Sequence, residues 1–447
     1  MNTRLDRRVM AAPVIALAMT IGLAACDLKV SNPGPVSDDY LNVNAAHDAV
    51  VNGAVRAFND ALGTNGSNFA MCGAVVSREW FPSGQTGSFA CSLQEMRNQL
   101  TPQGSSEWDR VQLARWVAEN GVARIKTARR DSFRDYSMAA LAMLYVGYVN
   151  RMAGEHVCST VIDGGPELPF TVHFARAESA FTEALSIAQY QKNTNLTQAA
   201  YAGRASVRTW RGNWTGAAED AAQVPSTYVY STPFNTVDQT QSNSLAIATV
   251  DVTRRNFTLW NTFYGDNYDQ FKDPRTPYRK NPDIAQRNGL GTVPDLGDGK
   301  GIYGAVPYWQ QRKYITDASA LSNAPIRLST GREMMLVTAE AKLRSGDFQG
   351  ALTIINQIRS TVGVALRTAT TSDQTWTWLK LEKLIELWLE GRALGERRRW
   401  LGDGADKAAP GDLPANLRMD DRTGKDRCFP ISLNEYNTNP NLTPPPG

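Results

Sequence analysis

Three carboxylates with a regular four-residue spacing are the first candidates for chemistry in this chain of 447 residues: Glu382, Glu386 and Glu390. Glycosidases use a pair of carboxyl groups as catalytic residues, one on each side of the scissile bond. Side chains one turn apart on a helix point to the same side, so these three cannot flank a substrate. Four arginines follow: Arg392, Arg397, Arg398 and Arg399. We therefore expect a charged helix face with ion pairs.

The other residue types that catalyse reactions or bind metals show no useful spacing. The three histidines, His47, His156 and His173, are too far apart to form a local motif. The chain also lacks a Gly-x-Ser-x-Gly elbow, a His-Glu-x-x-His metal motif and a phosphate-binding loop. We therefore expect no enzymatic activity, no cofactor and no metal ion. A surface hydrolase with a dispersed triad is a less favoured alternative.

The N-terminal residues have the features of an export signal. Three arginines precede an apolar run at residues 11–24 that is too short to span a bilayer as a helix. Small residues then lead to Cys26, the pattern that a lipoprotein signal peptidase cleaves. We expect residues 1–25 to be removed, Cys26 to be lipidated and residues 26–39 to form a tether. An ordinary secretory signal is the alternative. The formal net charge of +3 gives no strong attraction to nucleic acid.

Four cysteines remain beyond Cys26, namely Cys72, Cys91, Cys158 and Cys428. An even number of cysteines in an exported chain indicates disulfides. Of the possible pairings, Cys72 with Cys91 is the most local and closes a Gly/Ser-rich loop. We expect at least this pair to be bridged, and four buried free thiols are the alternative.

Apolar residues recur at helical spacing through much of the chain. The predicted helices lie within residues 40–59, 107–129, 132–153 and 174–190. The second of these has Leu113 and Trp116 among its apolar positions.

An internal repeat relates residues 205–217 to residues 339–351. Both segments have a small residue, then a glycine seven positions later, Asn or Asp, an aromatic residue, another glycine and alanine. A glycine in the left-handed conformation ends one helix, and the aromatic residue fills the gap before the return helix. This pattern predicts tetratricopeptide-type helical hairpins. A weaker third copy is predicted between Gly147 and Gly154.

The composition changes over residues 226–330, where proline, glycine and aromatic residues are frequent and the hydrophobic periodicity is weak. We expect long ordered loops with short strands, inserted into a helical frame made of residues 40–225 and 331–447 within one merged domain. Loops on a rigid frame are where binding residues tend to lie.

Aromatic residues in two loop regions are the candidate ligand contacts, because exposed rings suit the apolar faces of sugars. The first region holds Glu79, Trp80 and Phe81 beside the Gly/Ser-rich loop. The second is the insert, with the rings of Trp260, Tyr264, Tyr268 and Trp309 among the polar residues Asn261, Asp266, Asn267 and Gln310. Trp80 and Trp260 are favoured because their polar and glycine-rich neighbours indicate partial exposure. Packing in the core is the alternative for each ring.

The C-terminal third carries a family resemblance. Residues 333–363 resemble the signature hairpin of the SusD/RagB family of bacterial outer-membrane lipoproteins. Other segments resemble motifs of that family in its order, namely residues 26–33, Asp273–Arg275, Lys313–Tyr314, Glu386–Arg392, Arg397–Trp400 and Phe429–Asn441. Ser432 stands where the family usually has a second proline, and the extra cysteines are another departure. The resemblance covers nearly the whole mature chain.

The resemblance implies an all-α fold, an α-α superhelix of tetratricopeptide-like hairpins beside an irregular, ligand-binding segment. It also implies a lipid-anchored protein on the outer face of the outer membrane. Such a protein captures a nutrient, most often an oligosaccharide, and delivers it to a SusC-like TonB-dependent transporter without catalysis. The alternative is a tetratricopeptide lipoprotein that scaffolds envelope assembly. That role predicts regular tandem repeats, and the irregular insert argues against it.

Overall fold

The computed structural model describes residues 38–64, 66–83, 91, 100–238, 240–249, 256–280, 306–315, 321–417 and 427–443. The predicted export signal, Cys26 and most of the tether lie outside the described residues. Residues 84–90 of the Gly/Ser-rich loop also lie outside them.

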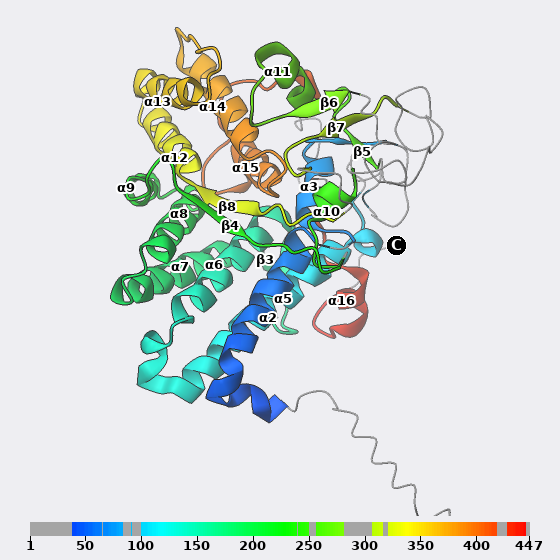
Figure 1. The fold of residues 1–447 in the computed structure, drawn as a ribbon, viewed down its shortest axis with the longest axis vertical. Helices are drawn as coiled ribbons and strands as arrows, with labels where there is room; N and C mark the ends of the chain where they lie inside the picture. The colour runs from blue at the N-terminus through cyan, green and yellow to red at the C-terminus, as the bar shows by residue number, and fades with distance from the viewer. Residues whose placement is uncertain are drawn as a thin grey trace, which may run out of the picture.

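Helices dominate the described chain, which confirms the predicted all-α fold class (Figure 1). The α-helices are α2 (His47–Leu62), α3 (Phe69–Val76), α5 (Ser106–Arg129), α6 (Ala139–His156), α7 (Val172–Tyr190), α8 (Thr194–Trp210), α9 (Trp214–Ala221), α10 (Ser244–Ile247), α11 (Phe263–Phe271), α12 (Gly331–Arg344), α13 (Phe348–Thr361), α14 (Ser372–Glu386), α15 (Ala393–Arg398) and α16 (Leu433–Thr438). Short 3-10 segments cover Asp38–Asn42, Asn44–Ala46, Pro102–Gly104, Arg130–Asp135 and Ala415–Leu417, and a π turn covers Arg399–Asp403.

The strands are short and pair two by two in antiparallel fashion. The pairs are β1 (Phe81–Pro82) with β5 (Phe257–Thr258), β2 (Ser159–Val161) with β3 (Glu167–Pro169), β4 (Val229–Thr232) with β8 (Ile326–Thr330), and β6 (Tyr278–Lys280) with β7 (Trp309–Gln311). The pair β4–β8 brings the two ends of the insert together beside α12. Between these ends the chain also forms α10 and α11, two short helices that weak periodicity did not predict.

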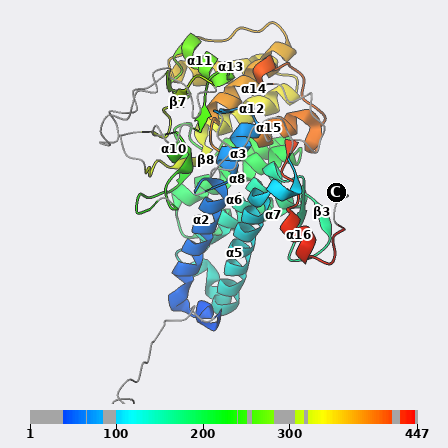
Figure 2. The ribbon, with the colours of Figure 1, turned by 90° about the vertical axis from the view of Figure 1, so that its right-hand side faces the viewer.

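Helices that follow one another pack side by side and build the frame. In Figure 2, α2 and α5 run as two long neighbouring helices, and Figure 1 shows α6, α7 and α8 in succession. The helices α12, α13 and α14 pack on one another at the opposite end from the start of α2. Their apolar faces form the core, because a helix with one apolar stripe must cover it with a neighbour.

The internal repeat is confirmed as two helical hairpins, α8–α9 and α12–α13. Gly212 and Gly346 have φ of +71° and +89°, the left-handed region that ends a helix. The next residue then caps the return helix. Asn213 Oδ1 accepts from the Gly216 N–H at 3.0 Å, and Asp347 Oδ1 accepts from the Gly350 N–H at 2.8 Å.

The weaker third copy is wrong, because Gly147 and Gly154 both lie inside α6. A Cβ added at Gly147 would lie 2.6 Å from the Phe181 ring, and one at Gly154 would lie 2.7 Å from the Phe174 ring. These glycines therefore let aromatic rings of α7 lie directly on the backbone of α6, a packing role that leaves the helix unbroken.

Two helix predictions need correction at their first residues, and a third in the face that it buries. The segment predicted from residue 40 becomes α-helical only at His47, and the one predicted from residue 132 only at Ala139, because 3-10 turns occupy part of the preceding chain. On α5, Leu113 and Trp116 are 59% and 48% exposed, so they lie outside the core. The helix has apolar residues on more than the one face that its neighbours cover.

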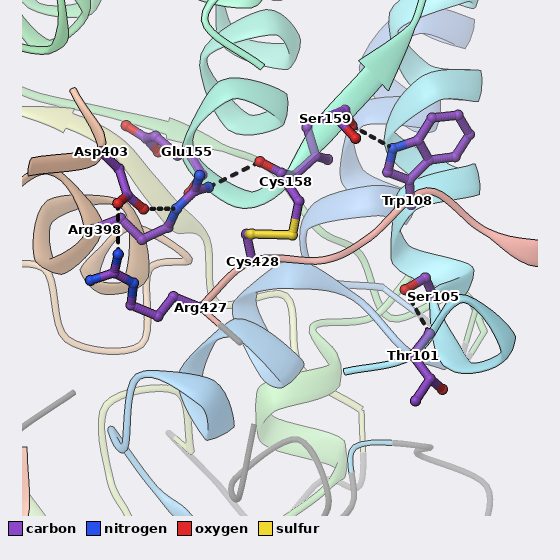
Figure 3. Close-up of a disulfide and its surroundings, with 11 residues drawn as sticks. Thr101, Ser105, Trp108, Glu155, Cys158, Ser159, Arg398, Asp403, Arg427 and Cys428 are labelled. Carbon is purple, nitrogen blue, oxygen red and sulfur yellow. Dashed lines mark hydrogen bonds and ion pairs between the residues drawn. A yellow bond between two sulfur atoms is a disulfide. The ribbon is translucent and has the colours of Figure 1, made fainter. Parts of the chain in front are cut away.

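The chain is cross-linked at two places. A disulfide joins Cys72 of α3 to Cys91, and a second joins Cys158, just after α6, to Cys428 of the C-terminal tail. Figure 3 shows the second bond among ion pairs of Arg398 and Arg427 with Asp403. The disulfide thereby fixes the tail to the end of α6, and the ion pair of Arg427 with Asp403 fixes it to the turn after α15.

Candidate ligand-binding site

Glu382, Glu386 and Glu390 form ion pairs, as the sequence predicted, but the expectation of a charged face on one helix is wrong, because all three are buried and Glu390 lies beyond the end of α14 at Glu386. Each carboxylate is at most 2% exposed. Their partners come chiefly from the insert and the start of α12. Glu382 pairs with Arg275 and Arg359. Glu386 pairs with Arg275, Arg327 and Arg332, and Glu390 pairs with Lys313 and Arg327. The following arginines have other partners: Arg392 pairs with Glu155 and Glu333, Arg398 with Asp403, and Arg399 with Glu340 and Glu396.

This buried network fixes the insert to α14 and to the turn that follows it. Arg275 Nη1 lies 2.6 Å from Glu382 Oε1, and Lys313 Nζ lies 2.7 Å from Glu390 Oε1. Burial alone would raise the pKa of the Glu386 carboxyl, but the guanidinium groups of Arg327 and Arg332 hold it below its ordinary value. A charged carboxylate in the core thus couples the insert to the frame and positions the strands described next.

The β6–β7 pair presents the ring of Trp309 at the surface of the insert. Its register places Lys280 directly opposite Trp309, and the Lys280 ammonium lies 4.5 Å from the indole centroid. Trp309 stacks on Tyr278 with 5.2 Å between ring centroids. The ring also lies against α11, where a Cβ at Gly265 would come within 3.2 Å of it. Trp309 is half-buried, with its orientation fixed on several sides.

Tyr268 continues this aromatic surface along α11. Its ring meets the edge of Tyr278 at 5.3 Å, so Tyr278 bridges Tyr268 and Trp309. The Tyr278 hydroxyl donates to Asp269 Oδ1 at 2.7 Å, and Lys280 Nζ donates to Asp269 Oδ2 at 2.8 Å. Burial, followed by the bond to Asp269, raises the pKa of Tyr278, which stays a neutral donor. Tyr268 is half-buried and therefore accessible.

Trp260 lies close to β7, because the N–H of its neighbour Leu259 donates to the Trp309 carbonyl at 3.0 Å. It follows β5, whose partner strand β1 brings Phe81 to it with 6.1 Å between ring centroids in an edge-on contact. Both rings are half-buried. Asn261, next in sequence, is exposed and has φ of +57°, a left-handed turn that suits asparagine. We define the ring surface as Trp260, Tyr268 and Trp309, the predicted rings that the structure leaves accessible.

The prediction that Trp80 is partly exposed is wrong. Trp80 is 1% exposed and stacks on Phe257 with 4.4 Å between centroids, and its indole N–H donates to Met71 O at 3.1 Å. The adjacent Glu79 is also buried, accepting from Ser77 Oγ at 2.7 Å and from the Leu389 N–H at 2.6 Å. The chain turns inward after α3, so polar and glycine-rich neighbours in sequence did not indicate exposure.

Tyr264 is likewise a core residue and not a surface ring. It is fully buried and stacks on Trp388 with 5.7 Å between centroids. Tyr264 lies on the inner face of α11, while Tyr268 one turn later remains half-buried. Among the polar neighbours, Asn267 and Gln310 are buried and bond to Thr276 and to the Thr249 carbonyl, whereas Asn261 and Asp266 are exposed.

Sequence reasoning missed Tyr278, Lys280 and Asp269, which hold the surface rings in place. Their role depends on the β6–β7 register and on the approach of α11 to these strands, and neither has a local sequence signal. A tyrosine followed two residues later by a lysine would have indicated at most an edge strand.

Two hollows have linings that include no residue of the ring surface. One, of about 160 Å³, is lined by Lys380, Arg397 and Trp400 with residues 408–417. The other, an open groove of about 560 Å³, lies between α5, α6 and α7. Its floor includes Val122, Met143 and Ala180, and its rim charges pair with each other or with neighbours, as Arg176 does with Glu119 at 2.6 Å. Size alone favours the groove, but its lining has no aromatic ring for a sugar to stack on.

Within the described ranges, no group of three or more His, Cys, Asp or Glu residues is arranged to hold a metal ion. The histidines are buried in protein contacts. His173 bonds to Asn150 and Thr160, and His156 bonds to the Met152 carbonyl. Burial lowers the pKa of both imidazoles to about 3, so they are neutral at physiological pH.

Comparisons with known proteins agree on one family. The sequence profile of the SusD family matches residues 182–447. Surface glycan-binding protein A from Bacteroides uniformis has a similar structure, with a TM-score of 0.68, 12% identity, and coverage of 90% of this chain and 99% of that chain. A SusD-like carbohydrate binding protein from Bacteroides fragilis has a TM-score of 0.64 and 13% identity, with coverage of 90% of this chain and 100% of that chain. A SusD superfamily protein from Bacteroides vulgatus has a TM-score of 0.61 and 14% identity, with coverage of 90% of this chain and 98% of that chain. No curated protein matches the chain.

Proposed function

The chain belongs to the SusD family, and from this premise we propose that it is a non-catalytic surface lipoprotein that binds a glycan. It passes that glycan to a SusC-like TonB-dependent transporter in the outer membrane. The observation that carries the proposal is the ring surface on the insert. There, half-buried rings of Trp260, Tyr268 and Trp309 lie beside exposed polar and charged groups.

The chemistry of a sugar matches this surface. A pyranose has apolar C–H faces that stack on aromatic rings and a rim of hydroxyl groups that need hydrogen-bond partners. Trp309 supplies a ring, and Lys280 and Asp269 lie next to it as donor and acceptor. The names of the structural relatives from B. fragilis and B. uniformis, a carbohydrate binding protein and a surface glycan-binding protein, support the same ligand class.

The state of the carboxylates supports binding without catalysis. Glycoside hydrolysis needs two carboxyl groups that face the substrate, one of them able to donate a proton. Glu382, Glu386 and Glu390 are buried and engaged by arginine or lysine side chains, so they cannot reach a bound sugar.

The lipid anchor at Cys26 and the transporter partner complete the proposal. Their basis is the signal pattern before Cys26 and the family, because the described residues begin at Asp38. None of the helices in the described ranges is both long and apolar enough to cross a membrane. Residues 26–39 would then serve as the tether between lipid and helical frame, with residues 40–225, the insert 226–330 and residues 331–447 acting as one unit.

Outer-membrane purification tests the anchor and the partner together. The wild-type protein is expected to carry a lipid on Cys26, detected by mass spectrometry, and to co-purify with a TonB-dependent transporter from detergent extracts. Cys26→Ser should release it from the membrane and weaken that association. Recovery of the wild type only as a free, unlipidated protein would overturn this part of the proposal.

A further inference from the structure

The last residue of α11, Phe271, begins a second aromatic cluster that the sequence did not reveal. Arg367, in the connection between α13 and α14, lies over this ring with 4.8 Å between its Cζ and the centroid. The same guanidinium lies 4.4 Å from the centroid of Trp378 on α14. We call Phe271, Arg367 and Trp378 the arginine cluster. All three are half-buried and reach the surface.

The arginine cluster is rigidly built. Asn356 of α13 accepts from the Arg367 backbone N–H at 2.8 Å and donates to its carbonyl at 2.9 Å. The Trp378 indole N–H donates to the Thr368 carbonyl at 2.9 Å. These bonds fix the backbone of Arg367 and the ring of Trp378, and the guanidinium lies against that ring and the ring of Phe271.

Among the residues that the structure describes, the Arg367 guanidinium has rings beside it but no acceptor within hydrogen-bond distance. It makes no hydrogen bond or ion pair with any residue in the described part of the chain, although it is half-buried. The neighbouring charges are already paired: Arg359 Nη1 lies 2.8 Å from Glu382 Oε2, and Asp273 Oδ2 lies 2.8 Å from Arg275 Nη2. Burial and the nearby Arg359 lower the pKa of Arg367 to about 10, so its surroundings disfavour an uncompensated positive charge.

An anion is the group that this arrangement lacks. A guanidinium offers planar, forked donors that match the two oxygens of a carboxylate or sulfate, and rings that cover its faces leave those in-plane donors available. Partial burial strengthens the charge–charge attraction relative to open water.

The arginine cluster is continuous with the ring surface. Phe271 and Tyr268 lie three positions apart on α11 and are therefore neighbours on one side of that helix. Figures 1 and 2 place α11 beside α13 and α14 at the same end of the molecule. Two further cations lie over rings of this face, Lys272 near Tyr268 and Lys280 near Trp309. A chain of sugar units that stacks on Trp309 and Tyr268 can thus extend along α11 to Arg367.

We propose that the arginine cluster is a second contact for the glycan and that Arg367 binds an anionic group of it, a carboxylate or a sulfate. The ligand class is therefore an acidic glycan. This inference rests on the proposed glycan-binding function and narrows it to one class of substrate.

Calorimetric titration with matched acidic and neutral glycans tests the inference. The probes are oligogalacturonides, alginate oligosaccharides and chondroitin sulfate oligosaccharides, each beside its carboxyl-reduced or desulfated form, together with neutral xylan and mannan oligosaccharides. Wild-type protein is expected to bind at least one acidic probe more tightly than its neutral counterpart. Arg367→Gln should lower the affinity for that acidic ligand by about 10- to 100-fold, which corresponds to the loss of a charged hydrogen bond. The affinity for the neutral counterpart should stay unchanged.

Two further variants make the result specific. Arg367→Lys keeps the positive charge but loses the forked pair of N–H donors, so it should give an intermediate affinity for the acidic ligand. It serves as the test if Arg367→Gln does not fold. Arg130→Gln removes an exposed arginine after α5, at the end of that helix that Figure 2 shows away from α11, and should leave affinity unchanged.

The failures of the two proposals are distinguishable. If neutral glycans bind as well as acidic ones, or if Arg367→Gln behaves like Arg130→Gln, the arginine cluster is not an anion contact and the glycan-binding function stands. If none of the probes binds the wild type, both proposals fall.

Discussion

Arg275 of the insert and Glu382 of α14 form a buried ion pair, with 2.6 Å between Nη1 and Oε1. Arg275 belongs to the Asp-Pro-Arg segment and Glu382 begins the series of carboxylates in the C-terminal third. Arg275 Nη1 also lies 3.5 Å from Oε2 of Glu386, the first residue of the Glu386–Arg392 motif. Two segments that resemble family motifs therefore meet in the core, where they hold the insert on the helical frame. This explains why such motifs identify the scaffold and do not identify the ligand.

Breaking this pair should strongly destabilise the protein. Arg275→Met leaves Glu382 and Asp273 with less compensation in the core, and we expect a loss of about 3–5 kcal/mol in the free energy of unfolding. The matched control is Arg56→Met, which removes the exposed pair of Arg56 with Asp60 and should cost at most about 1 kcal/mol. Denaturant unfolding measures both. Equal losses for the two variants would contradict the scaffold role of Arg275.

Trp80 and Trp260 should behave differently when replaced by alanine. Trp80→Ala removes a buried ring stacked on Phe257 and should cost about 3–5 kcal/mol of stability. Trp260→Ala removes a half-buried ring and should cost clearly less. Thermal unfolding of the two variants makes the comparison, and a Trp80→Ala protein as stable as the wild type would show that Trp80 is not a core residue.

Helical periodicity and turn chemistry predicted the frame well, because both are local. The helical spacing of apolar residues over 174–190 predicted α7, and Gly212 and Gly346 marked two hairpin turns. The site was harder to predict because exposure depends on distant partners. Trp80 is buried by Phe257, and Tyr264 by Trp388, each far along the chain. No local pattern reveals such pairs.

The arginine cluster illustrates the same limit. Phe271, Arg367 and Trp378 come from a helix of the insert, a loop and a helix of the frame. Their meeting depends on how α11 packs against α13 and α14, which the ion pairs of Arg275 help to determine. The sequence indicated two segments with candidate rings, and tertiary packing decided which of those rings face outward.

Both disulfides should be found in the exported protein. Peptide mapping without reduction is expected to recover Cys72 linked to Cys91 and Cys158 linked to Cys428. On the chain-entropy account the first bond stabilises by about 3 kcal/mol and the second, which closes a far longer loop, by about 5 kcal/mol. Cys158→Ser with Cys428→Ser should therefore lower stability more than Cys72→Ser with Cys91→Ser. Alkylatable thiols at these positions would contradict the pairing.

Glu79 should make stability depend on pH between about 4.5 and 7. Burial raises the pKa of Glu79 to about 7, against which its bonds to Ser77 and Leu389 act only in part. In that interval the folded protein holds a proton on Glu79 that the unfolded chain has released. The contribution of Glu79 to the free energy of unfolding is therefore complete below about pH 4.5. It is lost as the pH rises through 7, by up to about 1.4 kcal/mol per pH unit.

The control for this effect is Glu79→Gln, which keeps the shape and removes the titration. Other groups also titrate in this interval, so the quantity to compare is the wild-type unfolding free energy minus that of the variant, measured from pH 4.5 to 8. We expect this difference to fall as the pH rises. A difference that stays constant would mean that Glu79 is charged in the folded protein throughout.

The most direct test of the account is calorimetric titration of glycans into the wild type and Trp309→Ala, with Trp116→Ala as the matched control. Trp116 is 48% exposed on α5, away from the insert. We expect the wild type to bind a glycan and release it chemically unchanged, and Trp309→Ala to lose about 1–3 kcal/mol of binding free energy, by analogy with other stacked rings. Trp116→Ala should bind like the wild type, and thermal unfolding should show all three proteins fully folded at the temperature of the titration. Full affinity in Trp309→Ala, or cleavage of the glycan by the purified protein, would contradict the account.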